Sequence, residues 1–375
     1  MGTRQALAEA KRIVVKVGTS TITYSTGKLN LLRLEKLVRE LADLSNQNKE
    51  IILVTSGAVG AGVARLGLAE RPKTIPEKQA AAAVGQGILM QTYEKLFAEY
   101  GQVVAQVLLT REDSNHRKRF INSRNTLSTL LSMGVIPIIN ENDVVAVDEL
   151  KIGDNDTLSA TVASMIDADL LIILSDVDGL YTANPQHDPA AKLLSEVSDI
   201  TPEVEDLAGG PGTVQGTGGM FTKLQAAKIA INSGVTLVIA SGGRDGIIRE
   251  VLDGASLGTI FWPKEHTLEV RKRWLAFGNR VAGAVTVDQG CEQALLNKGS
   301  SLLAAGITRV EGSFGFGNTV RILSVEGREL ARGLSNYSAD DLRRIMGAHT
   351  NEIIAILGTK LYDEVIHRDN MVLLV

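Results

Sequence analysis

Short apolar runs alternate with segments of helical periodicity along most of this chain, and this alternation constrains its fold more than any other feature. The apolar runs are rich in Val, Ile and Leu and have the length of buried strands. Each of them ends in Gly, Ser, Asn or Asp. The pattern predicts an α/β fold with a mostly parallel sheet between two layers of helices, and a ligand site at the carboxyl ends of the strands. The predicted strands are Ile13–Val17, Ile51–Thr55, Val103–Leu109, Val135–Ile139, Leu170–Leu174 and Val235–Ala240, and the predicted helices are Leu31–Leu44, Gln79–Tyr100, Asn125–Met133, Thr157–Ile166 and Leu224–Ser233.

The character of the sequence changes near Pro263 and the basic run Arg271–Arg273, which indicates a domain boundary. Beyond it, short β-like runs are separated by glycine-rich turns, and these predict a small β-rich domain of about a hundred residues. A chain of 375 residues is longer than one hydrophobic core usually supports. We therefore expect two domains, 1–265 and 276–375. The β-like runs of the second domain are Ala284–Val287, Thr319–Leu323, Ile353–Ile356 and Met371–Val375.

Charge and cysteine content narrow the class of protein. A net charge of −4 argues against a chain that binds nucleic acid or membranes along its whole length. The single cysteine, Cys291, excludes an internal disulfide and fits a reducing compartment. No apolar run reaches the length of a membrane span, and Met1–Arg12 lacks the apolar core of a signal peptide. We therefore expect a cytoplasmic protein.

Two lysines lie beside glycine-rich turns of the kind that bind phosphate. In Thr217–Lys223, small residues precede a helix, whose unpaired N–H groups attract anions, and Lys223 adds a positive charge. Lys16 lies at the end of the first strand, next to Gly18. On position alone, an edge-strand lysine in solvent is an equal alternative for Lys16. The third turn, Ser56–Gly62, is explained as well by close packing of a strand on a helix.

Polar clusters end three further strands or turns: Asn140–Asp143, Gly153–Asp156 and Ser175-Asp176. Phosphoryl transfer needs positive charge at the transferring group, close backbone contact with phosphate and a fixed acceptor. The lysines and glycine turns supply the first two, and Asp and Asn side chains can hold an acceptor with an amino group. These residues predict a phosphoryl-transfer enzyme. Another α/β ligand binder remains an alternative, as do turn and cap roles for the Asp and Asn residues.

Taken in order, these motifs resemble those of the glutamate 5-kinase family, in the amino-acid kinase superfamily, followed by a PUA domain. The resemblance covers nearly the whole chain. It departs from the family pattern at Ile152, where Phe is usual, and at Asn318, where PUA domains often carry Asp. The motifs that carry it are Val15–Ser20, Thr55–Gly62, Asn140–Asp143, Gly153–Asp156, Ser175–Tyr181, Gly216–Met220 and, in the tail, Gly312–Val320, Gly327 and Arg332–Leu334.

The resemblance implies transfer of a phosphoryl group from ATP, with Mg²⁺, to the γ-carboxylate of L-glutamate. The product would be L-glutamyl 5-phosphate, made in the first step of proline biosynthesis, with feedback inhibition by proline. By resemblance, the catalytic residues are Lys16, Asp156 and Lys223, and the glutamate-binding residues are Ser56, Asp143 and Asn155. By resemblance, the nucleotide-binding residues are Lys16, Gly18, Gly57, Ser175, Asp176, Thr217, Gly218, Gly219, Met220, Phe221, Thr222 and Lys223.

The implied chemistry agrees with the residues present. A glutamate side chain is already ionised at pH 7 and needs no general base, so Mg²⁺, charge neutralisation and positioning suffice. The resemblance also implies a homo-oligomer (dimer or tetramer) and, as an option, association with the next enzyme of the proline pathway.

Two rival functions stay open. PUA domains are typical of RNA-binding and RNA-modifying proteins, although a net charge of +2 from residue 271 onward favours RNA binding only weakly. Sister kinases act on acetylglutamate, aspartate, carbamate or UMP, and among these the PUA-like tail argues for glutamate.

Overall fold

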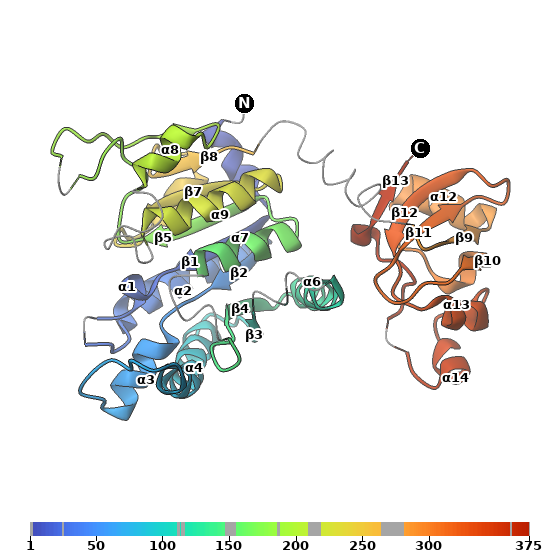
Figure 1. Cartoon of the computed structure of the whole chain (residues 1–375), viewed down its shortest axis with the longest axis horizontal. Coiled ribbons are helices and arrows are strands. Elements are labelled where there is room, and N and C mark those ends of the chain that lie inside the picture. The colour runs from blue at the N-terminus through green and yellow to red at the C-terminus, as the bar shows by residue number, and fades with distance from the viewer. Residues whose placement is uncertain are drawn as a thin grey trace. The chain divides into compact units, whose positions relative to one another are not determined.

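The chain forms two compact units, Met1–Thr267 and Leu268–Val375, each described here by itself (Figure 1). The computed structural model describes residues 3–24, 26–110, 113, 117–146, 155–185, 188–208, 219–263, 281–360 and 362–374. Gly153, Asp154, Thr217, Gly218 and the predicted boundary run Arg271–Arg273 lie outside these residues.

The N-terminal unit contains an eight-stranded sheet in the order β3-β4-β2-β1-β5-β7-β8-β6. Every pairing in it is parallel except that of β7 with β8, which confirms the predicted mostly parallel sheet. All six predicted strands are present, whereas β6 and β8 were not predicted because two or three residues leave no readable period. The strands are β1 (Arg12–Val17), β2 (Glu50–Val54), β3 (Val104–Leu109), β4 (Ile136–Glu141), β5 (Leu170–Ser175), β6 (Glu196–Val197), β7 (Thr236–Ser241) and β8 (Thr259–Phe261).

Helices cover both faces of this sheet, as the alternating pattern predicts (Figure 1). Apolar residues of α2, α4 and α10 build one core with one set of strand side chains, and those of α6, α7 and α9 build the other. The helices are η1 (Arg4–Glu9), α1 (Thr19–Ile22), α2 (Leu31–Asn46), α3 (Ala58–Leu66), α4 (Ile75–Ala98), α6 (Arg117–Ser132), α7 (Asn155–Met165), α8 (Pro202–Leu207), α9 (Met220–Asn232) and α10 (Ile247–Leu252).

Helix α4 begins at Ile75 rather than at the predicted Gln79. Thr74 and Glu77 form a capping box, in which each side chain binds the backbone N–H of the other residue, and a proline lies in the first turn. These are start signals that the apolar pattern alone does not contain. The first turn of α4 therefore lies closer to the predicted ligand edge than periodicity indicated.

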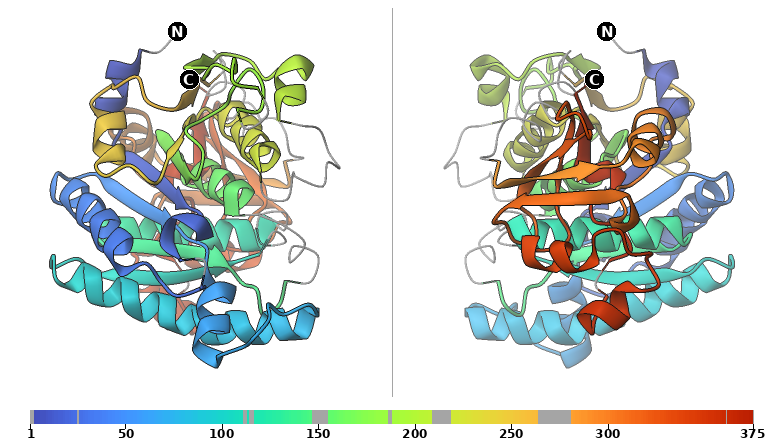
Figure 2. Two further views of the ribbon diagram at one scale, coloured as in Figure 1. Left: turned by 90° about the vertical axis from the view of Figure 1, so that its left-hand side faces the viewer. Right: turned by 90° about the vertical axis from the view of Figure 1, so that its right-hand side faces the viewer.

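Glycines hold α3 against α4, and the two helices lie side by side in both views of Figure 2. A Cβ on Gly62 would lie 1.8 Å from the carbonyl oxygen of Ala81, and one on Gly85 would lie 1.8 Å from that of Ala58. Gly57, the residue before α3, has φ +100°, a conformation that favours glycine. The turn Ser56–Gly62 thus serves both close packing and a sharp exit from β2.

The C-terminal unit contains a five-stranded sheet, β10-β9-β11-β12-β13, in which only β9 and β11 pair in parallel (Figure 2, right). The predicted strand Ile353–Ile356 is wrong, since these residues lie in helix α14. A four-residue apolar run fits either structure, and here Ile354 is exposed while Ile353 packs into the core. The elements are β9 (Gly283–Val287), α12 (Gln289–Lys298), η3 (Ala304–Gly306), β10 (Ile307–Gly312), β11 (Thr319–Leu323), β12 (Glu329–Leu334), α13 (Ala339–Ile345), α14 (Ile353–Leu357), η4 (Arg368–Asn370) and β13 (Met371–Leu373).

None of the helices within the described part of the chain combines the length and the hydropathy that a membrane span requires.

Candidate active site

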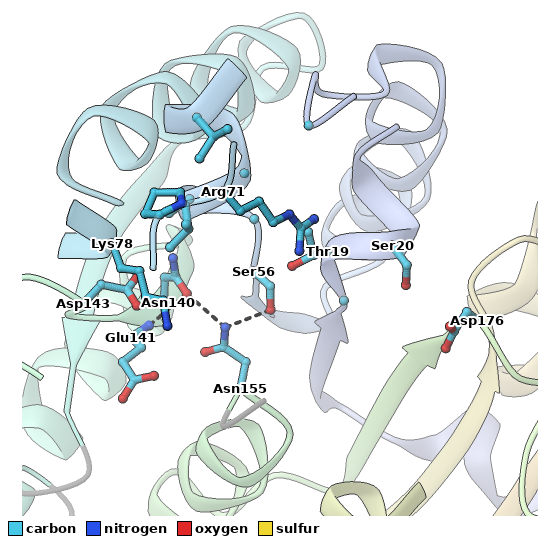
Figure 3. Close-up of a pocket in the computed structure, with 18 of the residues that line it drawn as sticks. Thr19, Ser20, Ser56, Arg71, Lys78, Asn140, Glu141, Asp143, Asn155 and Asp176 are labelled. Carbon is cyan, nitrogen blue, oxygen red and sulfur yellow. Dashed lines mark hydrogen bonds between the residues drawn. The ribbon is translucent and has the colours of Figure 1, made fainter. Parts of the chain in front are cut away.

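A polar cavity of about 770 Å³ lies at the carboxyl ends of β4, β2, β1 and β5, which are neighbours in the sheet. This is the edge at which open parallel sheets bind ligands. Side chains from the turns after all four strands line the cavity (Figure 3). Residues from the starts of α3, α4, α7 and α9 line it as well. The predicted polar clusters, distant in sequence, therefore meet in one place.

Lys16 lies on β1, which is flanked by β2 and β5 in the middle of the sheet. Only 7% of this lysine is exposed. The solvent-exposed edge-strand alternative is thus wrong. Because side chains alternate along a strand, Lys16 shares a face with Val14, which packs in the core formed with α7 and α9. The strand therefore directs the lysine toward the N-terminal ends of those two helices.

Asp156 joins Lys16 to Lys223, and we call these three residues the lysine centre. Its Oδ1 lies 2.6 Å from Lys16 Nζ, and its Oδ2 lies 3.2 Å from Lys223 Nζ. Asp156 comes from the first turn of α7 and is 2% exposed, and Lys223 comes from the first turn of α9 and is 5% exposed. Two cations and one carboxylate are thus fixed together at the cavity wall.

Burial and charge act against each other in the lysine centre. Burial alone would raise the pKa of Asp156, but the charges of Lys16 and Lys223 outweigh it and hold that pKa below its ordinary value. Burial lowers the pKa of Lys16, an effect that Asp156 opposes and Lys223 reinforces. The carboxylate is therefore ionised at neutral pH and holds two groups of like charge side by side.

Thr222 also contributes to this centre, since its Oγ1 can donate its one proton to Asp156 Oδ2 at 2.8 Å, with the carbonyl oxygen of Gly219 at 3.0 Å as the alternative acceptor. Gly219 is the residue before α9, and Met220 packs against the core behind it. Phe221 is partly buried in the same turn. The described part of the predicted turn Thr217–Lys223 thus leads directly into the helix that positions Lys223.

Ser175 and Asp176 follow β5 and line the cavity, with the Ser175 hydroxyl 3.1 Å from Asp176 Oδ1. Gly18 and Gly57 line it as well, as the residues that precede α1 and α3. The structure therefore gathers these four predicted nucleotide residues around the cavity that contains Lys16 and Lys223.

Asn155 connects the turns after β2 and β4. Its Nδ2 lies within hydrogen-bond distance of Ser56 Oγ (2.8 Å), Thr55 O (3.1 Å) and Asn140 Oδ1 (3.1 Å) (Figure 3). Its Oδ1 is buried and accepts no hydrogen bond from any described residue. A ligand that carries N–H groups would satisfy that oxygen.

Asp143 lines the cavity from the loop after β4 and forms no ion pair or hydrogen bond with the described residues. Burial raises the pKa of its carboxyl to about 6. Ser56, Asp143 and Asn155, the three predicted acceptor residues, all line the same cavity as the lysine centre.

Two further cations, Arg71 and Lys78, line the cavity and were not predicted. Lys78 lies at the end of the first turn of α4, where the helix dipole disfavours a positive charge. A lysine placed four residues after a capping threonine was therefore a usable signal in the sequence. Arg71 precedes the helix in an exposed loop, and nothing in its local sequence marked it.

This arrangement suits transfer of a phosphoryl group. Paired cations can neutralise the charge that spreads over the transferring oxygens, and an ionised acceptor would need no base. No cluster of three His, Cys, Asp or Glu residues able to hold a metal occurs among the described residues. The residues that line the cavity fit a Mg²⁺ ion bound mainly through nucleotide phosphates and water, with Asp176 as a carboxylate that could contact it.

Known proteins give an independent comparison. Residues 11–241 match the family model of the amino acid kinase family, and residues 283–357 match that of the PUA domain. The chain is 56% identical to the glutamate 5-kinase of Moorella thermoacetica, over 99% of this chain and 98% of that one. It is 54% identical to the glutamate 5-kinase of Caldanaerobacter subterraneus, over 97% and 98%. Among solved structures, the UMP kinase from Bacillus anthracis is similar at a TM-score of 0.47 and 16% identity, over 68% of this chain and 97% of that one.

Proposed function

The chain belongs to the amino acid kinase family, and from that premise we propose that it is a glutamate 5-kinase that transfers the γ-phosphoryl group of ATP to the γ-carboxylate of L-glutamate. The product is L-glutamyl 5-phosphate, the first intermediate of proline biosynthesis. The observation that carries the proposal is the lysine centre, in a cavity that also contains two polar groups without a partner among the described residues, the Asp143 carboxylate and Asn155 Oδ1.

Lys16 and Lys223 neutralise the transferring phosphoryl group in this proposal. Asp156 keeps the two ammonium groups together, so they need no rearrangement when charge develops in the transition state. The backbone of Gly18 and Gly57 approaches the phosphates. The proposed nucleotide pocket is completed by Ser175, Asp176 and the segment Thr217, Gly218, Gly219, Met220, Phe221 and Thr222.

Ser56, Asp143 and Asn155 hold the amino acid. Asp143 is a partly buried carboxylate without a partner among the described residues, which suits the α-ammonium group of glutamate. Asn155, which donates a hydrogen bond to Ser56, offers its Oδ1, which has no partner among the described residues, as a second hydrogen-bond acceptor. A Mg²⁺ ion bound with ATP would supply further positive charge at the phosphates.

We assign the reaction to residues 1–265 and propose that residues 276–375 form the PUA domain. RNA binding is not part of the proposal. The test is a salt-dependent gel shift of the full chain with RNA, and a complex that weakens steeply with salt would reopen the RNA-binding alternative.

The direct test is formation of a hydroxamate. Purified protein is incubated with ATP, Mg²⁺ and L-glutamate in the presence of hydroxylamine, which traps an acyl phosphate. We expect a glutamyl hydroxamate that forms only when ATP is present. A hydroxamate formed from aspartate or acetylglutamate in place of glutamate, or ADP released with UMP as the acceptor, would overturn the substrate assignment.

Feedback inhibition by proline is a finer part of the proposal. Proline also carries an α-ammonium and an α-carboxylate, so the groups that hold the head of glutamate can hold it too. We expect proline to raise the KM for glutamate in a titration at fixed ATP. An unchanged glutamate saturation curve would remove this part and leave the kinase assignment intact.

A further inference from the structure

The residues assigned to glutamate leave one of its three charges without a partner. Asp143 can take the α-ammonium group, and Lys16 and Lys223 lie where the γ-carboxylate meets the transferring phosphoryl group. The α-carboxylate still needs a positive group on the same side as Asp143, because it shares one carbon atom with the ammonium. Asn155 Nδ2 is already engaged by three oxygens.

Lys78 is a cation in that position. It lines the cavity from the first turn of α4, is partly buried, and makes no hydrogen bond or ion pair with the described residues. In Figure 3 it lies on the side of the cavity formed by Asn140 and Asp143. Lys78 and Asp143 therefore carry opposite charges on the same side of the cavity, and neither has a partner among the described residues.

Hydrogen bonds tie α4 to the segment that carries Asp143. Gln79, the residue after Lys78, donates through Nε2 to the carbonyl oxygen of Ala146 at 3.3 Å. About two turns further along α4, Gln86 accepts from Asn140 Nδ2 at 2.8 Å. The close approach of α3 and α4 at Gly62 and Gly85 fixes the helix from its other side. The start of α4 is thus held beside the acceptor loop.

We propose that Lys78 binds the α-carboxylate of glutamate and, together with Asp143, selects substrates that carry an intact α-amino-acid head. The proposal rests on the proposed function, whose acceptor it specifies. We call Lys78, Asp143 and Asn155 the acceptor end of the cavity. Charged hydrogen bonds to both groups on one carbon atom make this end specific, since an analogue without one group leaves a charged side chain unpaired.

Arg71 is the other cation in the cavity without a partner among the described residues. It comes from the exposed loop before α4, and its guanidinium lies near Thr19 in Figure 3, away from Asp143. An α-carboxylate next to an ammonium held by Asp143 would not face it. The geometry therefore favours Lys78, and Arg71→Met becomes the competing variant in the test.

The test compares L-glutamate with its α-amide, isoglutamine, which keeps the α-ammonium and the γ-carboxylate but lacks the α-carboxylate charge. ATP-dependent release of ADP gives kcat/KM for both substrates in the wild type, Lys78→Met, Lys78→Arg and Arg71→Met. Lys95→Met, on the exposed side of the same helix, is the matched control. The ratio of the two kcat/KM values measures recognition of the α-carboxylate independently of any general loss of activity.

We expect the wild type to prefer glutamate by roughly 10- to 100-fold, and Lys78→Met to bring that ratio close to one, mainly by raising the KM for glutamate. The KM for ATP stays unchanged, Lys78→Arg keeps most of the preference, and Lys95→Met keeps all of it. A preference retained in Lys78→Met, or lost in Arg71→Met instead, overturns the inference. A wild type inactive with glutamate contradicts the proposed function itself, so the two failures are distinguishable.

Discussion

The lysine centre and the acceptor end lie in one cavity but treat charge in opposite ways. At the lysine centre every charge already has a partner: Asp156 contacts both lysines, and Thr222 donates to the same carboxylate. At the acceptor end, Lys78 and Asp143 form no ion pair with the described residues, and Asn155 Oδ1 accepts no hydrogen bond from them. One region is complete without a ligand, and the other has the groups that a ligand would satisfy.

This difference predicts which kinetic constant each region affects. A pre-paired centre holds its cations in place before charge develops, so its substitutions should act on kcat. The residues of the acceptor end form their contacts when the substrate binds, so substitutions there should act on the KM for glutamate. The predictions below test that division, from the largest expected effect to the smallest.

The largest effect is expected for Asp156→Asn. The substitution keeps the shape but removes the charge that holds Lys16 beside Lys223, and it leaves two buried ammonium groups to repel each other. We expect kcat to fall by about 1,000-fold and the free energy of unfolding to fall by about 3 kcal/mol. Steady-state kinetics and chemical denaturation measure the two effects.

Asp169→Asn is the control for this variant. Asp169 accepts hydrogen bonds from the backbone N–H groups of Lys11 and Arg12, at the start of β1 and away from the cavity. Its substitution should leave kcat within a factor of about two. If Asp156→Asn also kept kcat within tenfold of the wild type, the lysine centre would be a structural ion cluster only.

A pH profile tests the acceptor end. Because the pKa of Asp143 is raised to about 6, its carboxyl gains a proton and loses its charge as the pH falls through that value. The attraction for the α-ammonium group is then lost, so kcat/KM for glutamate should fall about tenfold per pH unit below pH 6 and be level above pH 7. The effect should lie in the KM, with kcat at saturating glutamate changing much less.

Asp143→Asn serves as the reference for that profile. With no ionisable group at this position, kcat/KM should start roughly 10- to 100-fold lower and lose the decline near pH 6. A variant that keeps the same decline would assign it to another group and separate Asp143 from substrate binding.

The smallest effect is expected for Thr74→Ala, which removes the cap of α4 four residues before Lys78. Thr74 Oγ1 accepts from Glu77 N at 3.4 Å, and we expect its loss to cost at most about 1 kcal/mol of stability. Fraying of the first turn should raise the KM for glutamate about twofold and leave kcat unchanged.

A matched cap exists in the other compact unit. Ser338 caps α13 and accepts from Asp341 N at 3.1 Å, so Ser338→Ala should cost a similar free energy of unfolding without any change in KM. Equal KM changes in the two variants would show that the effect reflects global stability and not the position of Lys78.

Among the predicted site residues, those fixed by strand position are the ones whose place in the structure follows most directly from the sequence. Lys16, Asn140, Ser175 and Asp176 were predicted at the ends of strands, and because the strands are neighbours and parallel their ends meet in the cavity. Apolar runs of five or six residues determined these strands reliably. The three-residue strand β8 and the helix α14 were missed or misassigned, because so few residues do not distinguish the two periods.

Contacts between elements were not predictable in the same way. The pattern placed Asp156 near a helix start but did not reveal that one carboxylate joins both lysines, since that depends on how α7 and α9 pack. Lys78 was missed because the helix was predicted to begin after it. A lysine outside a predicted element is ordinarily a surface residue, and the packing of α4 beside the Asp143 segment brings Lys78 to the cavity wall.

The central claim is that the lysine centre acts on the transition state, and Lys223→Ala tests it most directly. Initial rates over a full matrix of ATP and glutamate concentrations give kcat and both KM values. The control is Lys228→Ala, at a partly exposed residue of the same helix that pairs with Glu205. We predict a fall in kcat of about 100- to 1,000-fold, with the KM for glutamate within about threefold of the wild type. A raised KM for glutamate with kcat preserved would contradict the claim and assign Lys223 to ground-state binding of the substrate.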